Sequence, residues 1–163
     1  MTGRYKLFER SSLKLLSLQE REHDLDLSCM LPLKTVYSRF AEIDEFSVEL
    51  INARTNAATS IIMLGGHVIR SGVQRYIIDL LESGLITCIA VNGACVVHDF
   101  EFSLVGATTE SVAKYIESGQ FGLWQETSII NDIINEGAAQ DLGLGEAIGK
   151  YILENDLRNA KLS

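Results

Sequence analysis

Cysteine and proline are scarce in this chain of 163 residues, and long apolar runs are missing. The three cysteines, Cys29, Cys88 and Cys95, form no C-x-x-C pair, which argues against a disulfide framework and against a zinc ribbon. No stretch reaches the roughly 18 apolar residues that a membrane helix needs, and Met1–Arg10 lacks the apolar run of a signal peptide. These absences predict a cytoplasmic protein with reduced thiols, no metal centre and no membrane contact.

Basic residues are also few. Lysine and arginine total 14 against 22 aspartates and glutamates, which gives a formal net charge of −8. A nucleic-acid surface needs clustered lysine and arginine, so this balance excludes nucleic acid as a partner. An acidic chain suits cationic small molecules such as polyamines, although solubility alone explains the same charge.

The hydrophobic pattern predicts a single α/β unit made of an N-terminal arm, residues 1–31, and a βαβ core with helices, residues 32–163. The arm has no sustained periodicity. Pro32 permits a helix start, and apolar residues at helical spacing over Leu33–Asn56 predict a long amphipathic helix. This helix is expected to lead into a strand over Thr59–Leu64.

A strand–helix–strand unit is expected next. The helical stripe over Val73–Leu81 ends at Gly84, and Leu85–Val91 is apolar on both faces, as in a parallel strand covered on both sides. Three further helices are expected: one capped by Thr108 or Thr109 and ending at Gly119, one over Ile129–Ile134 closed by Gly137, and one over Ala147–Ile152.

This count leaves the sheet incomplete. A two-stranded parallel sheet cannot bury both of its own faces. We therefore expect either that the chain pairs with another copy or that it is the N-terminal part of a longer domain.

Two small-residue turns mark the candidate site. The first runs from Gly65 to Gly72 and includes Ser71, a hydroxyl expected beside a helix N-terminus; the second is Asn92–Ala94. Since adjacent parallel strands end at one edge of a sheet, the turns predict a crevice of the kind that binds nucleotides and other anions. The first turn matches neither G-x-G-x-x-G nor the Walker lysine loop, so a tight turn without a ligand explains it equally well.

Three polar residues follow the second turn. His98, Asp99 and Glu101 would alternate between faces in a strand, whereas a helix would place His98 and Glu101 on one face. They suit hydrogen bonds to a ribose, a cationic substrate or a metal, of which metal is least supported because no H-E-x-x-H motif is present. A helix cap or a subunit-interface pair also explains His98 and Asp99.

Nucleophilic catalysis has little support in the sequence. Neither Ser71 nor Cys95 lies in a G-x-S-x-G motif, and Cys95 is either a thiol with a depressed pKa near a helix start or a buried inert one. The segment Gly119–Glu126 holds the sole tryptophan, Trp124, and is either a lid or interface loop or a connector with the indole packed inside.

Taken in order, the elements from Ile61 to about Phe102 resemble the deoxyhypusine synthase family, especially its deoxyhypusine-synthase-like members. The matching pieces are the strand into Leu64-Gly65-Gly66, the turn Val68–Gly72, the helix Tyr76–Leu80, and Asn92-Gly93-Ala94 followed by His98–Glu101. Weaker similarity extends to Leu153. The resemblance implies a Rossmann-like parallel sheet with flanking helices, NAD as cofactor, and a homo-oligomer, a tetramer, with active sites between subunits.

The resemblance also implies roles for individual residues. Those expected near NAD are Gly65, Gly66, His67, Ser71, Asn92, Gly93, Ala94 and Asp99, and those expected near the substrate are His98 and Glu101. His98 stands where the synthases proper have an acid. The family's catalytic lysine lies in its second half, and none of Lys114, Lys150 or Lys161 occupies that context.

In function, the resemblance implies an NAD-dependent transferase that moves an aminobutyl group from spermidine to a lysine of a translation factor. One alternative is a homospermidine-type polyamine synthase with putrescine as acceptor. Another is a non-catalytic binding or assembly subunit that lacks the catalytic lysine.

Overall fold

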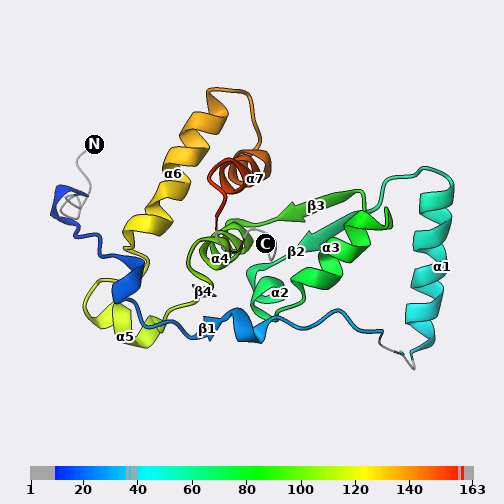
Figure 1. Ribbon diagram of the computed structural model, residues 1–163, viewed down its shortest axis with the longest axis horizontal. Helices are drawn as coiled ribbons and strands as arrows, with labels where there is room; N and C mark the ends of the chain where they lie inside the picture. The colour runs from blue at the N-terminus through cyan, green and yellow to red at the C-terminus, as the bar shows by residue number, and fades with distance from the viewer. Residues whose placement is uncertain (1–9, 36, 38–39, 158, 160–163) are drawn as a thin grey trace, which may run out of the picture.

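The computed structural model describes residues 10–35, 37, 40–157 and 159. Within them the chain is mixed α/β, with seven α-helices and two sheets of two strands each (Figure 1). The elements in chain order are β1 (Leu25–Asp26), α1 (Ala41–Thr55), β2 (Ile61–Leu64), α2 (Gly66–Arg70), α3 (Gln74–Glu82), β3 (Cys88–Val91), α4 (Gly93–Val105), β4 (Ala107–Thr108), α5 (Val112–Glu117), α6 (Gln125–Ala138) and α7 (Leu144–Glu154). Short 3-10 helices lie at Arg10–Ser12, Leu18–Glu20 and Leu27–Cys29.

The expected strand–helix–strand unit is present. β2 and β3 pair in parallel, from Ile61 opposite Cys88 to Leu64 opposite Val91. β3 begins three residues later than expected, because the amides of Leu85 and Ile86 donate to the Leu80 carbonyl and so close α3.

The parallel pair is covered on one face. Leu64 and Ile89 look toward α3 and α7, whereas Met63 on the opposite face is 79% exposed and Cys88 and Ala90 are also exposed. The expectation that the strand within Leu85–Val91 is covered on both faces is therefore wrong for the described part of the chain. An apolar sequence shows that side chains prefer burial, but it does not show that a partner covers them.

The helical stripe predicted over Val73–Leu81 belongs to α3, and the first turn itself contains the short helix α2. α2 ends at Arg70, and Gly72 then takes a φ of 75°, a left-handed conformation that only glycine adopts without strain. A Cβ on Gly72 would lie 2.0 Å from the Cys29 carbonyl oxygen, and the Leu31 amide donates to the Gly72 carbonyl at 2.8 Å. The N-terminal arm thus crosses the chain at this turn.

The main core surrounds α4. Phe100 at its centre is fully buried and packs against α6 and α7. The buried members of this cluster are Val96, Phe100, Ile130, Ile133, Ala147, Ile148 and Ile152.

The described part of the N-terminal arm packs on the body rather than extending from it. β1 pairs antiparallel with β4, and Leu18 is fully buried against Tyr115 and Trp124. The irregular sequence pattern of this segment corresponds to burial by short, separate contacts.

The long helix predicted over Leu33–Asn56 is shorter than expected, and positions 36, 38 and 39 within it lie outside the described residues. α1 begins at Ala41 and has no buried residue. Pro32 lies in an irregular segment whose carbonyl accepts from the Tyr76 hydroxyl at 3.0 Å, while that hydroxyl accepts from the Lys34 amide. These contacts with α3 hold the segment out of the helix.

Two predicted helix ends are also corrected. Ser111, not Thr108 or Thr109, caps α5, because Thr108 is committed to the β4 pairing. Gly137 lies inside α6, where a Cβ would lie 2.5 Å from the Ala147 Cβ; it allows α6 and α7 to approach closely and does not end the helix. No helix among the described residues is long and apolar enough to cross a bilayer.

Candidate functional site

The two small-residue turns lie side by side at the ends of β2 and β3. A Cβ on Gly65 would lie 3.9 Å from Asn92 Nδ2, and one on Gly66 would lie 2.9 Å from the Ala94 Cβ. Asn92 also caps α4, since its Oδ1 accepts from the Cys95 amide at 3.1 Å. Gly66 is therefore required for the contact between α2 and α4.

The other turn residues differ in accessibility. Gly93 and Ala94 are exposed, and nothing lies within 4 Å of a Cβ on Gly93. His67 is exposed on α2. Ser71 lies at the C-terminal end of α2, where its hydroxyl donates to the His67 carbonyl at 2.6 Å, so it does not stand beside a helix N-terminus as expected.

α4 is a helix, which decides how the polar residues after the second turn are arranged. His98 and Glu101 share one face with Ala94 and Val97, and all four line a cavity of about 420 Å³. Asp99 lies on another face and lines a separate cavity of about 240 Å³. Of the predicted site residues, Ala94, His98 and Glu101 thus line the larger cavity and Asp99 the smaller one, whereas the others line neither. The complete lining of the larger cavity is Arg21, Arg70, Ala94, Val97, His98, Glu101, Thr109, Glu110, Val112, Phe121, Gly122, Trp124 and Thr127.

Glu101 is 1% exposed and is fully engaged by neighbouring donors. Arg21 from the arm donates two hydrogen bonds to it, at 2.8 and 2.7 Å, and the hydroxyls of Thr108 and Thr127 donate at 2.6 and 2.9 Å. Burial alone raises the pKa of Glu101, but the bonds from Arg21 and Thr108 outweigh it and leave this pKa below its ordinary value. Glu101 is therefore an ionised carboxylate that is already neutralised by Arg21.

The same network assigns the tautomer of His98. Thr108 has one hydroxyl hydrogen, which it donates to Glu101, so the 2.9 Å contact between His98 Nδ1 and Thr108 Oγ1 must be donated by the imidazole. Burial lowers the pKa of His98, opposed by Glu101 and reinforced by Arg70 and other nearby cations. The ring is accordingly neutral at pH 7, with Nε2 as a hydrogen-bond acceptor.

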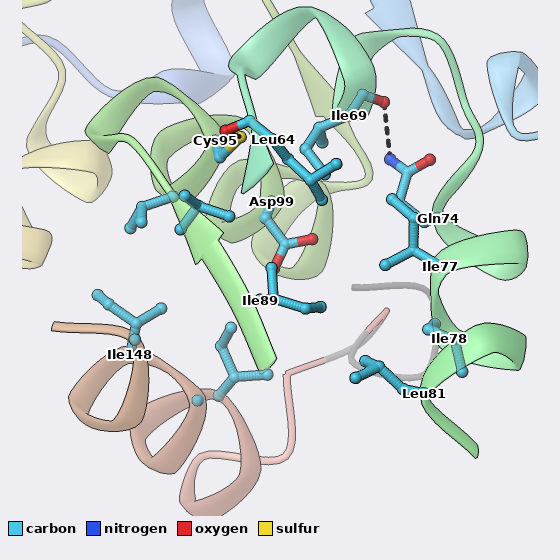
Figure 2. A pocket seen from close by; sticks show the side chains of 15 residues that line it. Leu64, Ile69, Gln74, Ile77, Ile78, Leu81, Ile89, Cys95, Asp99 and Ile148 are labelled. Carbon is cyan, nitrogen blue, oxygen red and sulfur yellow. Dashed lines mark hydrogen bonds between the residues drawn. The ribbon is translucent and has the colours of Figure 1, made fainter. Parts of the chain in front are cut away.

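Asp99 lines the smaller cavity among mostly apolar side chains, with Gln74 as the other polar residue of that lining. Figure 2 shows its carboxyl group within the smaller cavity, surrounded by Leu64, Ile69, Ile77 and Ile89. Burial raises its pKa to about 6, because a carboxylate loses hydration there and no cation replaces it.

Of the residues that line the larger cavity, the sequence predicts only Ala94, His98 and Glu101 as site residues. Arg70 and Thr109 are among those that it does not predict. Arg70 Nε and Thr109 Oγ1 are buried, and neither has a hydrogen-bond partner in the described part of the chain. Thr109 also has a φ of 67°, which is strained for a β-branched residue. The only arginine in the first turn was the available signal for Arg70.

The remaining alternatives from the sequence are decided by packing. Burial raises the pKa of Cys95, whose thiol contacts the Leu64 carbonyl at 3.3 Å, so the depressed pKa considered above is wrong and the thiol is buried. Trp124 is 1% exposed and packs inside, with its indole donating to Glu110 at 2.8 Å. Among the described residues, no three His, Cys, Asp or Glu side chains come together as metal ligands.

No family model, curated protein or solved structure matches this chain. A functional argument must therefore begin from the residues at the strand ends and in the two cavities.

Proposed function

We propose that this chain is the NAD-binding part of a deoxyhypusine-synthase-like transferase, and that β2 and β3 belong to a larger Rossmann-like sheet. The observation that supports this most is the shared edge at which both strands end. There Gly65 and Asn92 are neighbours, and Gly93 and Ala94 are exposed next to the larger cavity. Ligands of open α/β sheets bind outside the carboxyl ends of the strands.

The residues at this edge fit a dinucleotide. The space above Gly93 is open, so a pyrophosphate can approach the backbone closely. The 13-residue helix α4 begins there, and its first amides carry partial positive charge. Gly66 has the packing role that a glycine takes in a nucleotide-binding turn, close contact between backbone elements.

Bound NAD would supply the hydride acceptor for oxidation of an amine. The chain's own residues would hold it and orient the amine beside it: the amides of Gly93 and Ala94 toward phosphate, and the neutral His98 as a hydrogen-bond acceptor in the cavity. The uncovered face of the parallel pair, with Met63 and Cys88, supports further structure packing against it, as in a complete Rossmann-like sheet.

Titration with NAD, followed calorimetrically, tests the cofactor site. We expect Gly93→Val to weaken NAD binding at least tenfold, because its side chain would occupy the space next to the α4 amides. Gly143→Val is the matched control, since Gly143 also precedes a helix and also has nothing near its Cβ position. Failure of the unmodified chain to bind NAD, or equal binding by both variants, would reject the proposed site.

The alternative of a non-catalytic binding subunit is favoured by one observation. The residues that line the larger cavity include no lysine; Lys114 pairs with Glu22, and Lys150 donates to Gln140. Incubation of the complete protein with spermidine and NAD separates the two functions. Release of 1,3-diaminopropane supports the transferase, whereas NAD binding without any such release supports a binding subunit.

A further inference from the structure

A site for a polycation would be lined mainly by acidic side chains. The larger cavity is lined by cations as well as anions. Four charged side chains line it: Arg21, Arg70, Glu101 and Glu110. Arg21 and Glu101 satisfy each other. The ion pairs within 4.0 Å among the described residues are that pair and Lys114–Glu22, so Arg70 and Glu110 stand apart as a separate cation and anion.

Arg70 is the cation of the cavity wall that lacks an ion-pair partner among the described residues. Its guanidinium makes no hydrogen bond within the described part of the chain, and its Nε and the Thr109 hydroxyl are both buried without a partner. Unpaired buried donors are destabilising, and a planar guanidinium matches a carboxylate with two parallel hydrogen bonds. A carboxylate in the cavity would compensate the charge of Arg70.

Glu110 is the anion of the cavity wall that lacks an ion-pair partner among the described residues. Its two oxygens accept from the Gly122 amide at 3.0 Å and from the Trp124 indole at 2.8 Å, so the group is held in place by neutral donors. These bonds leave its negative charge uncompensated and leave lone pairs free. An ammonium group can therefore bind there.

The rest of the cavity wall is largely apolar. Val97, Val112, Phe121 and Trp124 contribute carbon surface to a cavity of about 420 Å³, which suits an aliphatic chain. A diamine would set one of its ammonium groups against Arg70. We propose that this cavity binds a small amine that also carries a carboxylate, with the carboxylate at Arg70 and the ammonium at Glu110.

The inference goes beyond the proposed function, since it assigns this cavity to an amine that carries a carboxylate and not to spermidine. Its binding is argued from the cavity alone and is tested without NAD, so the two proposals can fail separately.

The test uses three probes with the same six-carbon chain: 6-aminohexanoate, 1,6-diaminohexane and hexanoate. Binding is measured by calorimetry and by the fluorescence of Trp124, which is the sole tryptophan and lines the cavity. We expect 6-aminohexanoate to bind at least tenfold more tightly than either of the other two. Equal or tighter binding of the diamine or of hexanoate, or no binding of 6-aminohexanoate, would overturn the proposal.

Variants identify the contacts. Arg70→Gln is expected to weaken 6-aminohexanoate binding at least tenfold, and Arg70→Lys to retain part of it, since an ammonium keeps the charge but loses the two parallel bonds. Arg75→Gln, at an exposed arginine on α3, is the control and should change nothing. Urea unfolding of Arg70→Gln verifies that the variant is folded, and unchanged ligand affinity in that folded variant would refute the Arg70 contact.

Discussion

Arg21 and Glu101, 80 positions apart in the chain, form a buried pair with two hydrogen bonds of 2.8 and 2.7 Å. Arg21 also lies over the Trp124 ring, 5.5 Å from its centre. The pair joins the N-terminal arm to α4 and, through Thr127, to α6. It gives the larger cavity a wall whose charges are already balanced.

Removal of one charge from this pair should destabilise the fold. We expect Glu101→Gln to lower the free energy of unfolding by about 3–5 kcal/mol, because Arg21 would remain charged, buried and poorly paired. Urea unfolding at pH 7 measures the change. Glu22→Gln, at the exposed pair with Lys114, is the control and should unfold as the unmodified chain does. Equal stability of Glu101→Gln and the control would show that the buried pair carries no such weight.

Asp99 should make stability depend on pH in the opposite sense to a salt-bridged carboxylate. Its pKa is raised from 3.8 to about 6 in the folded state, so the folded chain holds this proton more tightly than the unfolded chain does. Stability is therefore lost as pH rises from about 4 to about 6, by at most about 3 kcal/mol.

The variant Asp99→Asn isolates this effect. Its stability relative to the unmodified chain should rise by about 1–3 kcal/mol between pH 4 and pH 7, and the two proteins should be nearly equal at the acid end. Paired urea titrations across that range provide the measurement. A constant difference at all pH values would mean that Asp99 keeps an ordinary pKa.

Three glycines near the strand ends should respond differently to alanine. Gly66→Ala brings a Cβ to 2.9 Å from the Ala94 Cβ and should cost about 1–3 kcal/mol by overpacking α2 against α4. Gly72→Ala should cost more, because it combines a positive φ with a backbone clash against Cys29. Gly93→Ala has open space and should be neutral within about 0.5 kcal/mol. Thermal unfolding of the three variants gives the order, and a neutral Gly72→Ala would contradict the position of the arm.

The thiols should differ in reactivity. Cys88 is exposed on the uncovered face of β3, whereas Cys95 is 2% exposed and burial raises its pKa. We expect an aromatic disulfide reagent to modify Cys88 rapidly and Cys95 only on unfolding. Comparison of native Cys88→Ser with the unmodified chain measures this. Rapid labelling of Cys95 in the native state would show that α4 opens readily.

Local sequence pattern was sufficient where one element decides its own conformation. Glycine-rich turns between apolar runs predicted β2 and β3 and their parallel pairing, and isoleucine spacing predicted α6 and α7. Local pattern was insufficient where a contact with a residue distant in sequence overrides the local conformational preference. Tyr76 holds the Pro32 segment out of a helix, and the pairing of Thr108 with the arm leaves Ser111 to cap α5.

For the candidate site, the sequence by itself determined that two small turns meet at one sheet edge, because parallel strands end on the same side. Only the tertiary structure decided that His98 and Asp99, adjacent in the chain, face different cavities, since that depends on α4 being a helix with packed surfaces on both sides. Tertiary structure alone also brought Arg21 to Glu101 and left Arg70 without an acidic partner. Charge compensation inside a fold depends on distances between remote segments, and these are not encoded in local spacing.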